Sequence, residues 1–130
     1  MILLDTHVVI WVSSGDSRLS SKAQTAIHEA RQAVRGLAVS DFTLVELSQL
    51  YWKNRIGLVI GPEDFLHELE RRFVILPITA NIALQAYALP ASYPKDPADR
   101  IIGATALVED IPLLTADRAI RNSKAVPTIW

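Results

Sequence analysis

The stretch ILLDTHVVIW, residues 2–11, contains the pattern on which the fold of this chain depends. Three apolar residues in a row, Ile2 to Leu4, predict a short buried strand that ends at Asp5. A strand that is apolar on both faces is typical of a parallel sheet covered by helices on each side. We therefore expect the rest of the chain to supply similar strands separated by helices.

Short apolar runs recur along the chain, and the segments between them have helical spacing. Further strands are predicted at 37–40 (LAVS), 74–79 (VILPIT), 112–115 (PLLT) and 126–130 (VPTIW). Helices are predicted over 20–35, 41–57, 62–73, 81–89, 97–108 and 116–122. This alternation predicts an α/β fold, a three-layer sandwich with a mainly parallel central sheet flanked by helices. We find no repeat or linker, so residues 1–130 are expected to form one domain.

Two helix boundaries carry specific expectations. The helix over 20–35 has an apolar stripe that runs from Ala23 to Val34, and Gly36 is expected to end it. Asp41 is expected to cap the helix that follows the second strand, because aspartate is a preferred residue at that position.

Composition excludes several classes of protein. The chain has no cysteine, so disulfides and thiolate metal sites are excluded. It has no run of about 18 apolar residues, which predicts no membrane span. The first residues lack a basic leader with a small-residue cleavage site, so we expect no signal peptide and a cytoplasmic location. The net charge is −1, so a nucleic-acid partner would depend on local basic residues and metal ions.

Half of the residues are hydrophobic and the mean hydropathy is +0.23. A sheet buried on both faces would explain this composition, and so would an apolar surface for a partner subunit. The two explanations are compatible.

Acidic residues stand where the predicted strands end. In open parallel sheets, ligands bind beyond the carboxyl ends of the strands. Asp5 follows the first strand, Glu46 lies shortly after the second, and Asp117 comes soon after the fourth. Asp99 lies at the start of the helix over 97–108. These four side chains are expected to gather at one edge of the sheet.

Helix capping is an alternative role for each aspartate, because acids suit the positive end of the helix dipole. Asp96 precedes Pro97, a residue favoured at the first helical position, so Asp96 is expected to be the cap. Asp99 could then bond back to the cap backbone. Capping does not explain Glu46, which lies inside a helix. Its burial would require a partner or a metal, whereas exposure to solvent would need neither.

Carboxylates that gather in one cleft repel each other, and a divalent cation relieves that repulsion. Oxygen ligands without histidine or cysteine suit Mg²⁺ or Mn²⁺. His7, His28 and His67 do not form a zinc pattern and are expected at the surface or in packing contacts.

Five segments of the chain resemble the PIN-domain nucleases, and among these the VapC-type toxins of bacterial and archaeal toxin–antitoxin pairs. The segments cover nearly the whole chain and occur in the family's order: LLDTHVVIW (3–11), SDFTLVEL (40–47), DPADRIIGATA (96–106), LLTADRAI (113–120) and VPTIW (126–130). The resemblance implies a metal-dependent endoribonuclease that hydrolyses phosphodiester bonds in RNA. It also implies a homodimer that is neutralised by a cognate antitoxin of the VapB type.

Carried over residue by residue, the resemblance implies that Mg²⁺ or Mn²⁺ is held by the four acids Asp5, Glu46, Asp99 and Asp117. Asp96 matches a further acid of the motif, as an outer-shell residue or a cap, and Thr115 matches a hydroxyl residue beside the site. Thr6 is a weaker candidate that could orient Asp5 or cap a following helix.

Basic and aromatic residues near the predicted site have two interpretations each. Lys95, Arg100 and Arg118 could contact RNA or lie on a solvated surface, and an ion pair is the more usual role for Arg100. The three tryptophans, Trp11, Trp52 and Trp130, could stack on bases, but packing is expected for all three. The segment 52–60 could be an apolar contact surface or a loop packed on the core.

Other classes fit less well. A haloacid-dehalogenase-like phosphatase needs a second aspartate at the position of His7, and a dinucleotide-binding domain needs a glycine-rich turn after the first strand. A receiver domain needs paired acids and a later lysine that are not arranged here. A PIN nuclease of RNA processing or quality control and an inactive PIN-fold binding module stay open.

Overall fold

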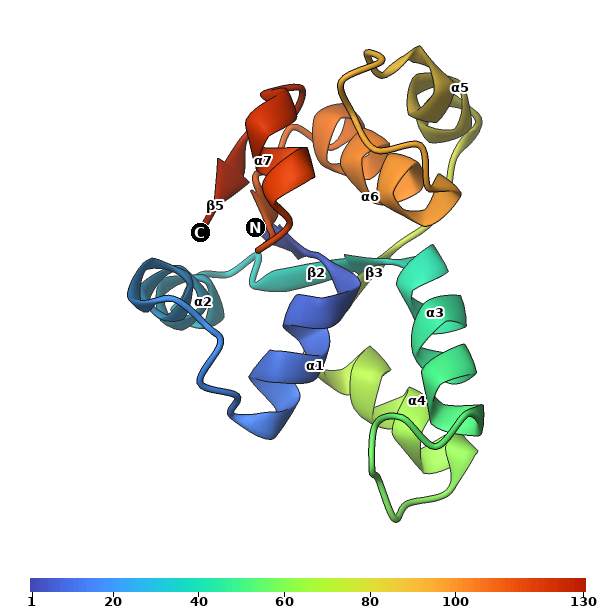
Figure 1. Ribbon diagram of the computed structural model, residues 1–130. Coiled ribbons are helices and arrows are strands. Elements are labelled where there is room, and N and C mark those ends of the chain that lie inside the picture. The colour runs from blue at the N-terminus through green and yellow to red at the C-terminus, as the bar shows by residue number, and fades with distance from the viewer.

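A five-stranded parallel sheet forms the centre of the computed structural model, which describes residues 1–130 (Figure 1). The strand order is β3-β2-β1-β4-β5, and every neighbouring pair is parallel. The strands are β1 (Ile2–Leu4), β2 (Leu37–Ser40), β3 (Val74–Leu76), β4 (Leu113–Leu114) and β5 (Thr128–Ile129). Each strand lies within a segment predicted from the sequence, so the α/β class and the parallel sheet are confirmed.

Seven helices connect or flank these strands. They are α1 (Thr6–Ser14), α2 (Ser21–Gln32), α3 (Asp41–Trp52), α4 (Pro62–Arg72), α5 (Ala80–Ala88), α6 (Pro97–Val108) and α7 (Arg118–Ser123). The bounds of α6 are those predicted. Helix α1 was not predicted as a separate element, because its run of apolar residues lacks a clear helical stripe. None of the helices has the length and hydrophobicity that crossing a membrane requires.

Alternating side chains of the strands separate two cores, one on each face of the sheet. Leu4 packs in a cluster with residues of α1, α2, α3 and α4, whereas Leu3 packs with residues of α6 and α7. Helix α5 packs on the outer side of α6. Figure 1 shows these helices on opposite sides of the sheet. This period of two is what a strand imposes, and it confirms the three-layer arrangement.

The expected end of the second helix is wrong. Helix α2 ends at Gln32, and Ala33 already has an extended backbone. Val34, which was placed on the apolar stripe, is fully exposed. The chain leaves the helix early because it must reach the start of β2 at Leu37, and Gly36 makes that turn with a φ of 65°.

The expected cap of α3 is also wrong. The side chain of Ser40 accepts the hydrogen bond from the N–H of Phe42, so Ser40 is the cap. Asp41 lies in the first turn, and its carboxylate accepts a hydrogen bond from the N–H of Ile78 at 3.1 Å. Asp41 therefore holds the loop after β3 against the start of α3.

Helix α3 ends at Trp52, before the predicted position near Gly57. Asn54 has a left-handed backbone with φ of 57°, and the N–H of Arg55 bonds to the carbonyl of Leu50 at 2.9 Å. Asparagine tolerates this conformation, which commonly ends helices.

Candidate active site

The candidate site lies at the carboxyl ends of the three central strands, β2, β1 and β4. From β1 the chain adds β2 and β3 on one side of the sheet, and it later adds β4 and β5 on the other side of β1. The order in which strands are added therefore reverses at β1. Such a switch point leaves a crevice beyond the strand ends in α/β sheets. Asp5 and Thr115 are the first residues after β1 and β4. Helix α6 runs back into β4, so its first turn also lies at this edge.

Asp5 both caps α1 and faces the site. One carboxylate oxygen, Oδ1, accepts the N–H of Thr6 at 2.8 Å, and Oδ2 accepts the hydroxyl of Thr115 at 2.7 Å. The side chain is buried, and this burial raises the pKa of Asp5, while the Thr115 bond partly opposes the rise. One oxygen of Asp5 therefore serves as the cap of α1, while the other is held by Thr115, and the role of Asp5 in a metal site stays a prediction.

Glu46 is half-buried on the inner side of α3. Its Oε1 accepts a hydrogen bond from the hydroxyl of Thr6 at 2.6 Å, and burial raises its pKa. The hydroxyl of Thr6 in turn lies 3.1 Å from that of Thr43. The Thr6 side chain does not cap α1, because the carboxylate of Asp5 is the cap, and its hydroxyl contacts Glu46 and Thr43 rather than the carboxylate of Asp5. Thr6 instead links Asp5, through its backbone, to Glu46, through its hydroxyl.

Asp96 is the cap of α6, as predicted. Its Oδ1 accepts hydrogen bonds from the N–H groups of Ala98 at 2.8 Å and Asp99 at 3.2 Å. The carboxylate of Asp99 makes no hydrogen bond and no ion pair, so it does not bond back to the cap. Capping therefore explains Asp96 but not Asp99.

Asp99 has the largest electrostatic perturbation among the acids. Burial is the first cause and raises its pKa to about 7. The second cause is the set of carboxylates around it, which belong to Asp5, Asp96, Asp117 and Glu46. All five acids are therefore near enough for their charges to interact, although the four elements that carry them are far apart in the sequence.

Asp117 caps α7, where its Oδ1 accepts the N–H of Ile120 at 3.0 Å. Its own N–H donates to the hydroxyl oxygen of Thr115 at 3.1 Å. Thr115 is completely buried and thus contacts both Asp5 and Asp117. The expectation that Thr115 lies beside the predicted acids agrees with this geometry.

Tyr93 also supports the site, although the sequence indicated only a loop there. Its buried hydroxyl donates to the backbone carbonyl of Asp99 at 2.7 Å. The ring lies against Gly103, where any side chain would collide with it. A glycine inside a helix is a signal of such close packing and could have suggested this contact.

Arg100 does not form the ion pair that was its more usual expected role. Its guanidinium donates to the backbone carbonyls of Ala86 at 3.1 Å, Leu89 at 3.4 Å and Tyr93 at 3.5 Å. It joins α6 to the end of α5 and the following loop, so we withdraw it as an RNA contact. Lys95 and Arg118 are exposed, and their contact with RNA stays a prediction.

The tryptophans differ from one another. The rings of Trp11 and Trp130 pack together at 5.8 Å, and Arg18 lies over Trp11 at 4.9 Å. Trp52 remains 74% exposed, so the expectation that it is packed is wrong. It is the last residue of α3, where its neighbour Tyr51 faces the core instead.

No Lys or Arg side chain forms an ion pair with the acids of the site, whereas His7 lies near enough for its charge to lower the pKa of Asp5 and of Glu46 against the effect of burial. All three ion pairs of the structure, Arg18 with Asp16 and Arg71 and Arg72 with Glu68, lie outside it. The donors are carboxylate and hydroxyl oxygens, which is the donor set that Mg²⁺ and Mn²⁺ prefer. No three acidic or histidine side chains are grouped closely enough to hold a metal ion as they stand. The charges and the oxygen donors of the site suit such a cation, but the side chains would have to move closer together to hold it.

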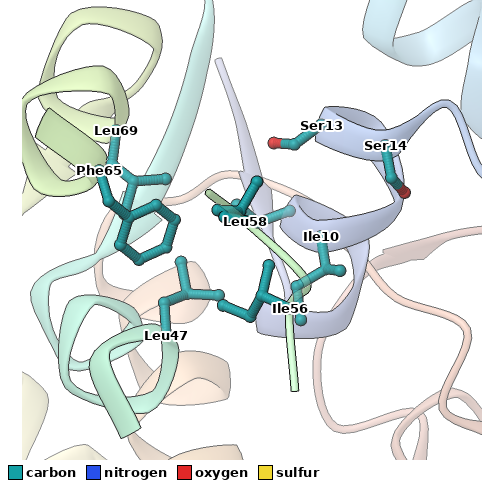
Figure 2. Close-up of a pocket in the computed structure, with 9 residues that line it drawn as sticks. Ile10, Ser13, Ser14, Leu47, Ile56, Leu58, Phe65 and Leu69 are labelled. Carbon is teal, nitrogen blue, oxygen red and sulfur yellow. The ribbon is translucent and has the colours of Figure 1, made fainter. Parts of the chain in front are cut away.

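An apolar pocket of about 90 Å³ lies between α1, α3, α4 and the loop after α3 (Figure 2). Seven of its nine lining residues are hydrophobic, among them Leu47, Ile56, Leu58 and Phe65. The loop that closes it belongs to the segment 52–60. Ile56 packs on the core, as one interpretation of this segment expects, whereas Val59 is fully exposed, and a contact surface there stays a prediction.

Comparisons with known proteins give a consistent result. The sequence profile of the PIN domain matches residues 2–125. Ribonuclease VapC22 of Mycobacterium tuberculosis is 39% identical over 131 aligned residues, which cover 99% of this chain and 98% of that protein.

Solved structures share the fold. A toxin–antitoxin complex from Klebsiella pneumoniae matches with a TM-score of 0.64 and 24% identity, over 90% of this chain and 87% of that one. VapBC2 of Rickettsia felis, bound to a DNA fragment from its promoter, matches with a TM-score of 0.70 and 16% identity, over 98% and 97%.

Proposed function

Because this chain belongs to the PIN-domain family and within it to the VapC-type proteins, we propose that it is an endoribonuclease toxin. It would hydrolyse phosphodiester bonds in RNA and be neutralised by a cognate VapB-type antitoxin. The observation that carries the proposal is that Asp5, Glu46, Asp99 and Asp117 lie near enough for their charges to interact, with no Lys or Arg ion pair among them. A nearly full-length relative named as a ribonuclease supports it.

The proposal includes dependence on Mg²⁺ or Mn²⁺, with Asp5, Glu46, Asp99 and Asp117 as the residues that would hold the ion. When bound, such a cation activates water as a nucleophile and stabilises the negative charge that develops on the phosphate. The support is the oxygen-only donor set and the unrelieved repulsion among the carboxylates. No side-chain nucleophile is required.

The chain's own residues would position this chemistry. Thr115 holds Asp5 and Asp117 from between them, and Thr6 holds Glu46 beside Asp5. Burial of Asp5 limits the access of bulk water to that side of the site. Glu46 or Asp99 would orient the attacking water through a carboxylate oxygen. Both oxygens of Asp99 lack a hydrogen-bond partner in the protein and are therefore available for this role.

The antitoxin would have to satisfy two surfaces. The unbalanced carboxylates would attract a basic side chain, and the apolar pocket with the exposed residues Val59 and Ile60 would accept apolar ones. A homodimer and a cytoplasmic location are further parts of the proposal, as is a single domain over residues 1–130. Light scattering of the toxin with and without its antitoxin would measure both assemblies.

RNA cleavage by the purified protein tests the proposed activity. Total RNA would be incubated with Mg²⁺, with Mn²⁺ and with EDTA, using wild type and Asp5→Asn. Asp110→Asn is a matched control, because Asp110 is exposed and has a left-handed backbone that asparagine also tolerates. We expect discrete products that require the metal, persist in the control and disappear in Asp5→Asn.

Wild-type cleavage by a folded Asp5→Asn protein would contradict the site, and full activity in EDTA would contradict the metal requirement. A folded, antitoxin-free protein that neither cleaves RNA nor binds Mn²⁺ would indicate an inactive PIN-fold binding module. Cleavage confined to one precursor RNA would indicate a nuclease of RNA processing or quality control.

A further inference from the structure

Thr43 is a completely buried residue of α3, one turn before Glu46. Its hydroxyl has one neighbour with which it can bond, the hydroxyl of Thr6 at 3.1 Å. A buried hydroxyl without a partner costs free energy, so this contact is the one that satisfies Thr43. Thr43 lies within the segment SDFTLVEL (40–47) but is not among the residues that the resemblance assigns to the site.

Counting protons gives the contact a direction. Thr6 has a single hydroxyl hydrogen, and it donates that hydrogen to Oε1 of Glu46 at 2.6 Å. In its contact with Thr43, the oxygen of Thr6 must therefore be the acceptor. The hydrogen bonds run from Thr43 to Thr6 and from Thr6 to Glu46.

A second buried threonine satisfies its hydroxyl in a different way. Thr105 of α6 is also completely buried, and its hydroxyl donates to the carbonyl of Ile101 in its own helix at 2.7 Å. This local bond is the usual one for a threonine inside a helix. Thr43 lies in the first turn of α3, where the residue four positions earlier, Val39, belongs to β2, and its hydroxyl contacts Thr6 of α1.

We propose that Thr43 is a positioning residue that fixes the rotamer of Thr6 and, through it, the carboxylate of Glu46. Without the Thr43 hydroxyl, the oxygen of Thr6 loses its donor and the side chain of Thr6 is free to rotate about its Cα–Cβ bond. Glu46 then loses its only hydrogen bond from the protein. The consequence for metal binding and cleavage rests on the proposed function, whereas the geometric consequence does not.

The test compares variants that remove and retain the hydroxyl. Thr43→Val removes the hydroxyl but keeps the shape of the side chain. Thr43→Ala removes both the hydroxyl and the methyl group, and Thr43→Ser retains the hydroxyl. Thr105→Val is the matched control for loss of a buried threonine hydroxyl. Calorimetric titration of the metal-free proteins with Mn²⁺ and the kcat and KM of RNA cleavage are the first two readouts.

Partners that orient metal-binding side chains typically contribute 10–100-fold to affinity or activity. We expect losses of roughly this size, in Mn²⁺ affinity and in kcat, for Thr43→Val and Thr43→Ala. KM for RNA should change little, because Thr43 is buried. Thr43→Ser should restore both quantities, and Thr105→Val should leave both within about twofold of wild type, since its hydroxyl serves only α6.

A crystal structure of metal-free Thr43→Val provides the readout that does not depend on function. We expect the contact between the Thr6 hydroxyl and Glu46 to be lost. Retention of that contact, or Mn²⁺ affinity equal to wild type in both hydroxyl-free variants, would overturn the inference. If wild type neither binds Mn²⁺ nor cleaves RNA, the proposed function fails, and the crystal structure alone decides the role of Thr43.

Discussion

Glu46 and Leu47 are consecutive residues of α3, yet they belong to two regions that are held together differently. Glu46 lies at the acidic edge, where hydrogen bonds from threonines and helix caps hold side chains whose charges repel. Leu47 lies in the apolar pocket, where α1, α3 and α4 meet through hydrophobic contacts. One helix thus presents a polar, electrostatically unfavourable face to one neighbour and an apolar face to another.

The difference separates function from stability. Burial of unbalanced carboxylates opposes folding, so the acidic edge is expected to reduce the stability of the metal-free protein. The apolar contacts of Leu47 remove hydrocarbon from water and stabilise the fold. Substitutions at the acidic edge should therefore reduce activity without reducing stability, whereas substitutions in the apolar contacts should reduce stability without reducing activity.

The largest effect is expected for Glu46→Gln. Glutamine has nearly the same shape and can still accept the hydrogen bond from Thr6, but it lacks the charge that a cation requires. We expect the rate of RNA cleavage to fall by about 100-fold or more, with a thermal midpoint no lower than that of wild type. Initial rates and thermal melts of the purified variant would measure both. Activity near that of wild type would remove Glu46 from the site.

Leu47→Ala should have the opposite result. Leu47 is 2% exposed, and truncation of a buried leucine typically costs about 3 kcal/mol in the free energy of unfolding. Urea denaturation should show this loss, while the cleavage rate per folded molecule stays close to that of wild type. A large loss of cleavage rate in Leu47→Ala protein that is fully folded would mean that the two faces of α3 are coupled. Leu47→Met, which conserves volume, is the control.

The pH dependence of stability should identify the acidic edge. The pKa of Asp99 is about 7 in the folded protein, against an ordinary value of 3.8, and the pKa values of Asp5 and Glu46 are also raised. The native state therefore holds more protons than the unfolded chain between about pH 4 and pH 7, and the stability of the metal-free protein falls as pH rises through this window.

Asp99→Asn should weaken that dependence. At pH 8 in EDTA, we expect it to raise the free energy of unfolding by about 1 kcal/mol, a value that allows for solvent screening of this half-exposed group. At pH 4 the variant and wild type should agree. Urea denaturation at the two pH values measures the difference, and a variant that is equally stabilised at both would point to a cause other than charge.

The smallest effect is expected for Val59→Ser. Val59 is fully exposed next to the apolar pocket, so its replacement should change the free energy of unfolding by less than about 0.5 kcal/mol. Ile56→Ser, a few residues earlier in the same loop, should be clearly more destabilising because Ile56 lines the pocket. Urea denaturation of both variants would show where the folded core ends. Equal destabilisation would mean that Val59 packs against the protein in solution.

Local features of the sequence determined the elements and several of their ends. Apolar runs of three or four residues located the strands, and their alternation with helical segments predicted the parallel sheet. Asp96 was recognised as a cap because capping needs only the backbone of the next turn and the following Pro97. Asp5 was placed at the edge of the sheet because it directly follows a parallel strand, and the family resemblance predicted that Glu46, Asp99 and Asp117 join it there.

Local signals misled where the chain had to satisfy a distant neighbour. The apolar residue Val34 matched a helical stripe, but the helix had to end in time for the chain to enter β2. Aspartate is a preferred cap residue, but the carboxylate of Asp41 bonds instead to the N–H of Ile78 in the loop after β3. Arg100 suited an ion pair, but its guanidinium bonds to carbonyls at the end of α5 and in the following loop.

The sequence by itself determined the elements, their order and the identity of the acids, because spacing, capping and strand ends depend on neighbours in the chain. The tertiary structure decided how those acids are held. The bonds from Thr43 to Thr6, from Thr6 to Glu46 and from Thr115 to Asp5 join residues 37 to 110 positions apart. A hydrogen bond forms only when donor and acceptor are placed to within a few tenths of an ångström. Between such remote segments, only the packing of the sheet and the helices sets that placement.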